Sequence, residues 1–245
     1  KDHSWKENVY FVLVEPKESG NIGASARAIK NMGFTNLILI NSLPLQDEAY
    51  WMAWASQDVL EKAQIFRELD ESLKDKALIV GTTRRRGAKR GAIFDVKDGV
   101  KRIYEVAHDN KVAILFGRED KGLFNEEVEK CGYLITIPTS LLQPSLNLAQ
   151  AVLIVAYELM RCDEFEDFHI KRQFYVSQTE LDKLYERLFN ILKKIGYISD
   201  NPDIEKRIVN NFRHFFGRTG LTFWELKLLH GVCTHIEELF VKAQD

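Results

Sequence analysis

The chain has 245 residues, of which 45% are hydrophobic, so it can bury a core in one large domain or in one domain with a smaller appendage. Lys and Arg number 34 against 36 Asp and Glu, and the formal net charge of −2 gives no overall sign of nucleic-acid binding. Three widely spaced cysteines argue against a disulfide framework, and no apolar run approaches the ~20 residues that cross a bilayer, so we expect a soluble, cytoplasmic protein.

Buried strands alternate with helices over the first part of the chain. Residues 9–14 (VYFVLV) form a continuous apolar run typical of a strand covered on both faces, and residues 20–32 indicate a helix that ends at Gly33. The same features predict strands at 37–40, 77–80, 112–116 and 133–137, and helices near 58–75, 97–107 and 124–131. This alternation predicts an α/β fold with a mostly parallel sheet.

The last part of the chain is predicted to be helical. Residues 145–162 hold good helix formers and close the first domain, while the charged, aromatic stretch at about 163–177 lacks periodicity and is interpreted as a linker. Beyond it, residues 178–195 and 223–242 have helical patterns. We therefore expect a sheet domain at 1–165 and a small α-helical domain at 178–245.

The segment NIGASAR at 21–27 opens the first predicted helix. Asn21 and Arg27 lie within two turns of the helix N-terminus, where exposed backbone amides favour anions, so a phosphate could bind here. A purely structural interpretation also fits, with Asn21 as the N-cap, Gly23 and Ala24 allowing close packing, and Arg27 as a solvated charge.

The segment LFGREDKGL at 115–123 follows a buried strand. Glycines at 117 and 122 would let the backbone approach a ligand closely, although the pattern lacks the Lys-Ser/Thr of a phosphate-binding P-loop. The alternative is a strand-to-helix turn with Glu119 and Asp120 near the N-terminus of the next helix.

A third segment starts where Ile137-Pro138 ends a strand. A seven-residue loop leads to Ser145-Leu146-Asn147-Leu148, which starts a helix with two polar side chains two residues apart. Ser145 is an acceptable N-cap, but a cap alone does not require Asn147, which has poor helix propensity.

Basic and aromatic residues mark further candidate surfaces. Residues 82–90 (TTRRRGAKR) follow a strand and are either a solvated loop or a contact for RNA phosphates. The basic residues of this cluster are Arg84, Arg85, Arg86, Lys89 and Arg90. A second candidate RNA-facing patch comprises Arg207, Arg213, His214, Phe215, Phe216 and Arg218. Phe215 and Phe216 are more simply interpreted as core residues. Trp51 and Trp54 are interpreted as packing residues rather than as a base-stacking platform.

Two classes of site find no support in the sequence. The histidines show no HExxH or HxH pattern, so we expect no metal. The GxGxxG fingerprint of nicotinamide enzymes is missing after the first strand, which argues against a dinucleotide oxidoreductase.

The three segments occur in this order in one family, and over about residues 8–160 the chain resembles the SpoU family of RNA 2′-O-methyltransferases. The stretches NVYFVLVEPKESGNIGASARAIKNMGFTNL, FGREDKGLFNEEVEKC and SLNLAQAV carry the resemblance. The segment FRHFFGRTGLTFWELKLLHGV is similar, less specifically, to the helical C-terminal domain of the family's TrmJ branch.

The resemblance implies a deep trefoil knot at the C-terminal end of the sheet domain, a homodimer, and S-adenosylmethionine bound in a bent form among the knot loops. By motif position, the implied donor-binding residues are Thr82, Thr83, Arg84, Gly117, Ile137, Pro144, Ser145 and Leu146. The implied catalytic residues are Asn21, Arg27, Glu119, Ser145 and Asn147.

The implied reaction is attack of a ribose 2′-hydroxyl on the methyl carbon of a sulfonium, in line with the departing sulfur. Proximity and electrostatic stabilisation of the 2′ oxygen then carry catalysis. Because a guanidinium has a pKa above about 12, we expect Arg27 to orient the nucleophile and stabilise its charge rather than act as a base. Ser145 would hydrogen-bond the 2′-hydroxyl, and the other three catalytic residues would hold the loops and the ribose.

The resemblance points to tRNA as the substrate, at anticodon-loop nucleotide 32, with cytidine, uridine or both accepted. Two alternatives stay open. One is a ribosomal-RNA methyltransferase of the same family, and the other is an RNA-binding protein that has lost catalysis, against which the five intact catalytic residues count.

Overall fold

The computed structural model describes residues 4–85, 91–162, 172–198 and 202–242, and its centre is a seven-stranded sheet in the order β3-β2-β1-β6-β4-β7-β5. The strands are β1 (Val9–Val14), β2 (Asn36–Ile40), β3 (Gln64–Phe66), β4 (Leu78–Thr82), β5 (Ile93–Asp95), β6 (Val112–Phe116) and β7 (Tyr133–Thr136). Every pairing between these strands is parallel, which confirms the predicted α/β fold.

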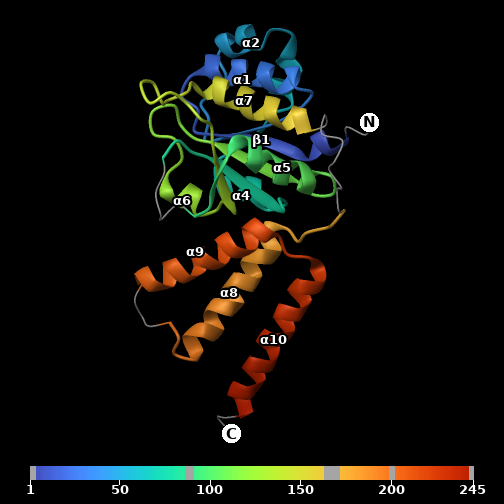
Figure 1. Cartoon of the computed structure of the whole chain (residues 1–245), viewed down its shortest axis with the longest axis vertical. Helices are drawn as coiled ribbons and strands as arrows, with labels where there is room; N and C mark the ends of the chain where they lie inside the picture. Colours follow the sequence, from blue (N-terminus) through green and yellow to red (C-terminus); the bar gives the residue numbers. More distant parts are fainter. Residues whose placement is uncertain (1–3, 86–90, 163–171, 199–201, 243–245) are drawn as a thin grey trace.

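Helices cover both faces of the sheet (Figure 1). Those on one face are α1 (Ser19–Asn31), α5 (Val96–Ala107) and α7 (Leu148–Arg161), with η1 (Ser4–Asn8), α2 (Asp47–Ala53), η2 (Trp54–Ser56) and α3 (Gln57–Glu61) packed around them. Those on the other face are the short helices α4 (Leu69–Leu73) and α6 (Asn125–Val128). The sheet is therefore the middle layer of three.

The sequence of β1 follows from this burial. Its side chains alternate between the two cores, with Phe11 and Leu13 in the cluster that contains α1, and Val12 and Val14 in the cluster on the opposite face. Because both faces exclude water, no position along the strand favours a polar residue, and the run is apolar throughout.

Two short strands differ from the prediction. The helix predicted near 58–75 is interrupted by β3, and β5 is not predicted at all. Each has three residues and lies at an edge of the sheet. Such strands are too short for an alternating pattern to stand out, and their pairing with β2 and β7 identifies them.

The interpretation of Trp51 and Trp54 as packing residues is wrong, since their side chains are 73% and 69% exposed. Helix α2 instead packs on α1 through Ala49 and Ala53, both fully buried. A Cβ atom added to Gly23 of α1 would lie 2.0 Å from the carbonyl oxygen of Ala49, so the two backbones meet directly. Small residues permit this approach, and the large ones point outward.

Three long helices follow the sheet: α8 (Gln178–Lys194), α9 (Pro202–Thr219) and α10 (Phe223–Lys242). The predicted helices at 178–195 and 223–242 correspond to the first and the last. Helix α9 is not among the predicted helices, and it is rich in Asn, Phe and Ile, which are only moderate helix formers.

The helical region is attached to the sheet region by hydrogen bonds. The backbone N–H of Tyr175 donates to Asn110 Oδ1 at 2.7 Å, and Arg102 Nη2 donates to the carbonyl of Thr219 at 2.8 Å. The backbones of Gly132 and Gly217 also touch, since a Cβ on Gly132 would lie 2.2 Å from the carbonyl oxygen of Gly217. Residues 163–171 of the expected linker lie outside the described residues, and the proposed domain boundaries stay a prediction.

The trefoil knot also stays a prediction. None of the described helices is long and apolar enough to cross a membrane.

Candidate active site

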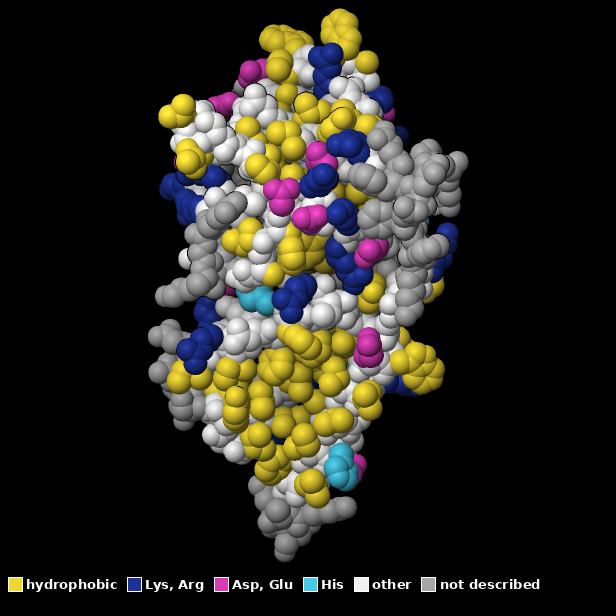
Figure 2. Space-filling view, viewed as in Figure 1, with side chains coloured by type: hydrophobic (Ala, Val, Ile, Leu, Met, Phe, Trp, Pro, Cys, Tyr) yellow, Lys and Arg dark blue, Asp and Glu magenta, His cyan; other side chains and the backbone are white. Residues whose placement is uncertain are grey.

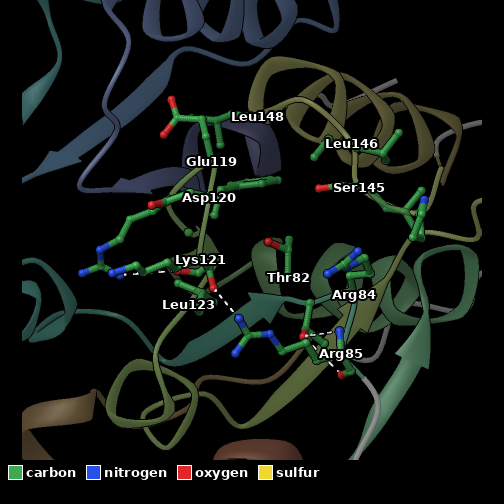
Figure 3. Close-up of a pocket in the computed structure, with 18 of the residues that line it drawn as sticks. Thr82, Arg84, Arg85, Glu119, Asp120, Lys121, Leu123, Ser145, Leu146 and Leu148 are labelled. Atoms are coloured by element: carbon green, nitrogen blue, oxygen red, sulfur yellow. Dashed lines mark hydrogen bonds between the residues drawn. The ribbon is translucent and has the colours of Figure 1, made fainter.

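A pocket of about 150 Å³ opens at the carboxyl edge of the sheet. Strands β6, β4 and β7 are neighbours, and because they are parallel the loops that follow them leave from one edge. These loops, at 82–85, 117–123 and 137–146, supply most of the lining (Figure 3). They carry the described part of the basic cluster and the second and third sequence segments.

All eight residues predicted to bind a methyl donor line this pocket: Thr82, Thr83, Arg84, Gly117, Ile137, Pro144, Ser145 and Leu146. Two opposite walls are visible in Figure 3, one with Glu119 and Asp120 and the other with Ser145 and Leu146. Thr82 is fixed by a 2.9 Å hydrogen bond from its hydroxyl to the carbonyl of Leu115.

The loop after β6 turns back sharply because it contains glycines at 117 and 122. A Cβ on Gly117 would lie 2.1 Å from the carbonyl carbon of Gly122, and Gly122 has a φ of 64°, which side chains other than glycine rarely adopt. The N–H of Gly122 donates to the carbonyl of Arg118 at 2.8 Å and closes the turn. Main-chain atoms of this loop therefore face the pocket at close range.

Beneath this loop lies Arg118, which is 6% exposed and was not among the predicted site residues. Its Nε donates to Glu15 at 2.8 Å, its Nη1 and Nη2 donate to Glu127 at 3.0 and 2.9 Å, and its guanidinium stacks 3.9 Å from the Phe124 ring centroid. The hydrogen bond from Arg118 lowers the pKa of Glu15. The arginine thus connects the end of β1, the turn and the start of α6.

Glu119 joins two of the sequence segments. Its carboxylate accepts a hydrogen bond from Asn21 Nδ2 at 3.0 Å and another from the backbone N–H of Lys17 at 3.1 Å. Asn21 Oδ1 in turn accepts from Asn147 Nδ2 at 2.8 Å. An asparagine at 21 can donate to a carboxylate and accept from an amide at once, which an aspartate could not do. Three of the five predicted catalytic residues are therefore brought together.

The same contacts correct two interpretations of helix ends. Helix α7 begins at Leu148 and its N-cap is Asn147, whose Oδ1 accepts from the N–H of Ala149 at 2.9 Å, so Ser145 precedes the helix and is not its cap. Helix α1 is preceded by Glu18 as N-cap, and Asn21 lies inside its first turn. Asn147 therefore caps α7 with its Oδ1 and donates to Asn21 with its Nδ2.

Arg27 lies elsewhere. It is exposed on α1 and is not among the residues that line the pocket. It shares a helical stripe with Gly23 and Lys30, and Lys30 donates to the carbonyl of Ala55 at 2.9 Å, so this stripe runs beside α2 and η2. Within the part of the chain that the structure describes, the contacts that join Asn21, Glu119 and Asn147 do not include Arg27.

The basic cluster is described only in part. Arg84 and Arg85 are exposed and line the pocket, and Arg85 Nη2 donates to the carbonyl of Lys121 at 3.1 Å, which connects two pocket loops (Figure 3). The other expected RNA contacts, Arg86, Lys89 and Arg90, lie outside the described residues.

The chemistry of the lining is mixed. Ile135, Ile137 and Leu148 supply an apolar wall, while charged side chains and loop backbone supply hydrogen-bonding groups opposite it. Such a pocket suits a small molecule with a flat apolar part and a charged part. Within the described part of the chain, no group of three or more His, Cys, Asp or Glu residues could hold a metal ion.

Comparison with known proteins gives matches over both regions. Residues 8–157 match the model of the SpoU rRNA Methylase family, and residues 179–245 match that of the C-terminal domain of the tRNA methyltransferase TrmJ. A relative from Escherichia coli, named tRNA (cytidine/uridine-2′-O-)-methyltransferase TrmJ, is 36% identical over 239 residues, which are 95% of this chain and 96% of the relative.

Two solved structures are similar over nearly the whole chain. TrmJ from Z. mobilis ZM4 has a TM-score of 0.77 and 30% identity, and covers 93% of this chain and 98% of its own. A probable methylase family protein from Haemophilus influenzae Rd KW20 has a TM-score of 0.63 and 29% identity, and covers 97% of this chain and 99% of its own.

Proposed function

The chain belongs to the SpoU rRNA methylase family, and on this premise we propose that it transfers a methyl group from S-adenosylmethionine to a ribose 2′-hydroxyl of tRNA. The observation that carries the proposal is the pocket where the loops after β4, β6 and β7 meet, with the Asn21, Glu119 and Asn147 contacts beside it. The match of residues 179–245 to a tRNA methyltransferase domain and the name of the Escherichia coli relative support tRNA as the substrate class.

The pocket fits the methyl donor. The apolar side chains of Ile135, Ile137 and Leu148 suit an adenine ring, and the backbone of the turn at Gly117 comes close enough to bond ribose or amino-acid groups. Bound there, the donor supplies an electrophilic methyl carbon on a sulfonium. Arg118 and the Asn21, Glu119 and Asn147 contacts keep the surrounding loops in place, so little ordering is needed on binding.

The nucleophile is the ribose 2′-hydroxyl, which restricts the substrate to RNA. Ser145 is exposed at the pocket, where its hydroxyl can hydrogen-bond the 2′-hydroxyl and orient it. Arg27 stabilises the negative charge that develops on the 2′ oxygen, together with a neighbouring phosphate.

Arg27 requires a second subunit for this role, because it lies outside the pocket of its own chain. We propose that α1 and α7 form the contact between two copies. Helix α7 packs on α1 and exposes Leu153 and Tyr157, which are 39% and 44% exposed and one helical turn apart. The Arg27 side chain of each copy then completes the pocket of the other.

The target nucleotide is position 32 of the anticodon loop, as cytidine, uridine or both, and the protein acts in the cytoplasm. Exposed Arg84 and Arg85 at the pocket rim supply phosphate contacts. Ribosomal RNA is the alternative substrate, since the family model is named for rRNA methylases.

The deciding experiment incubates the protein with a labelled methyl donor and unmodified tRNA transcripts, and then maps the 2′-O-methylated nucleotide. A transcript with a 2′-deoxy residue at position 32 is the matched control. We expect transfer to the first and none to the second. Transfer to ribosomal-RNA fragments alone, or to the deoxy transcript, would overturn the proposed substrate or the proposed nucleophile.

A further inference from the structure

Helices α8, α9 and α10 do not close into a bundle. The first residues of α8 and α10 and the last residues of α9 lie together near the sheet, and the three helices diverge away from it (Figure 1). Their shared core is confined to the end next to the sheet, where it contains Leu181, Leu184, Phe216 and Leu226. Helices α9 and α10 both pack on α8, which separates them over their remaining length. The far halves of all three helices therefore lack a common core.

An apolar groove of about 620 Å³ lies along the side of α8 that faces α9. Its lining comprises Leu192, Tyr197, Ile208, Asn211, Phe212 and Phe215. Tyr197 is 69% and Phe215 54% exposed, which is unusual for large apolar side chains in one place. Figure 2 shows hydrophobic side chains gathered over the near face of this helical part of the molecule.

Helix α10 carries a second apolar stripe that no described element covers. One side of the helix, with Leu226 and Cys233, is buried against α8. The other side presents Trp224, Leu228 and Val232 at intervals of four residues, which are 77%, 68% and 49% exposed. A helix that is apolar on two sides needs a neighbour on each, and α10 has one.

The exposed apolar surface approaches the size of a standard interface. Five side chains of the groove and the stripe are at least 49% exposed: Tyr197, Phe215, Trp224, Leu228 and Val232. Side chains of this size and exposure present roughly 650 Å² per copy, against about 800 Å² per partner in a standard interface.

We infer that the outward stripe of α10 docks into the α8–α9 groove of a second copy of this chain. The groove and the stripe belong to one sequence, so a twofold axis would fill both grooves at once, as a self-complementary interface requires. Within one chain α8 keeps the stripe away from the groove. RNA is disfavoured as the occupant of the groove because the groove lining holds no Lys or Arg to contact phosphates, while Lys227 lies over the Trp224 ring at the start of the stripe. This interface is separate from the proposed contact through α1 and α7.

A cross-linking experiment on the full chain tests the contact directly. Leu228→Cys protein is mixed with Phe215→Cys protein under mild oxidation. The native cysteines, at 131, 162 and 233, are buried and stay unreactive. We expect a covalent dimer in the mixture. The matched control replaces Phe215→Cys with Ile65→Cys, since Ile65 is 64% exposed on β3 and lies outside the surface. A yield no higher than that of the control overturns the inference.

The double variant Leu228→Asp/Val232→Asp gives an independent measurement. Both side chains are exposed in the single chain, so its circular dichroism and the melting of the sheet region should stay those of the wild type. Since the proposed contact through α1 and α7 already joins two copies, sedimentation measures this second contact as association beyond that dimer, and we expect its dissociation constant to rise at least about 100-fold in the variant, because charges would be buried in an apolar groove. A wild type that does not associate beyond a dimer, or a variant that associates as the wild type does but loses tRNA binding, would contradict the inference and leave the methyl-transfer proposal intact.

Discussion

Replacing Arg118 with leucine removes a cation on which two carboxylates depend. The side chain of Glu127 is only 12% exposed, and it would be left without its charged partner in a poorly solvated place. Breaking a buried ion pair from one side costs about 3–5 kcal/mol. The second partner, Glu15, is 42% exposed, so solvent screens its charge and its loss adds little. We expect Arg118→Leu to lower the free energy of unfolding by about 3 kcal/mol.

Urea unfolding measures this loss of stability, and two further variants test whether it comes from the unpaired charge of Glu127. Arg85→Leu is the matched control, because Arg85 contacts the same loop through one hydrogen bond but is exposed, and it should change stability by less than about 0.5 kcal/mol. The double variant Arg118→Leu/Glu127→Gln should recover most of the loss. It removes the stranded charge and keeps the acceptor for the N–H of Phe124, which lies 2.7 Å from Glu127 Oε2.

The same variants should separate stability from ligand binding. The double variant recovers the free energy of unfolding but lacks the hydrogen bond that connects the turn to Glu15. Its affinity for S-adenosylmethionine should therefore stay below that of the wild type in calorimetry. If Arg118→Leu unfolds within about 0.5 kcal/mol of the wild type and binds the donor normally, then the role given to Arg118 is wrong.

Four more predictions follow from the site. Arg27→Ala should lower the single-turnover rate of transfer about 10²–10³-fold with donor affinity nearly unchanged. Arg27→Lys should not rescue transfer, because the lysine ammonium cannot make the two parallel hydrogen bonds of a planar guanidinium. Near-normal transfer by either variant would refute this role. Asn147→Asp should keep the cap of α7 but lose the donation to Asn21, so activity should fall more than melting temperature, whereas Asn147→Ala should lower both. Arg118 lowers the pKa of Glu15, so this carboxylate stabilises the fold fully above its unfolded pKa near 4.5. The contribution is lost as the pH falls through the lower folded pKa. Acid titration should therefore show a smaller loss of folding stability for Glu15→Gln than for the wild type. Donor binding in calorimetry should be the same with a chelator present, and a requirement for a divalent ion would contradict the proposed donor site.

Local sequence pattern predicted the elements that are buried on both sides. The run at 9–14 is apolar because β1 contacts a core on each face, and such runs are recognisable without knowing the neighbours. The three-residue edge strands β3 and β5 were missed, because what identifies them is their pairing with β2 and β7. The exposure of Trp51 was mispredicted for a similar reason: helical spacing shows which residues share a side, but not which side is covered.

The pocket residues could be predicted from the sequence because the segments after 80, 116 and 136 all follow parallel strands. Strand direction alone brings the ends of these strands to one edge of the sheet, and the resemblance to a family indicated which residues of the following loops bind the donor. All eight residues predicted to bind the donor do line the pocket. Their chemical roles, and those of the five predicted catalytic residues, stay predictions.

The sequence by itself determined the α/β class, the strands with two buried faces and the loops that carry polar residues, because each of these depends on the neighbours along the chain. The tertiary structure alone decided that Arg118 lies between Glu15 and Glu127 and that Asn147 meets Asn21 across 126 positions. It also decided that α8 separates the apolar stripe of α10 from the groove beside α9. Such pairings depend on strand order and helix placement, and hydrophobic periodicity reports how deeply a residue is buried but not what it is buried against.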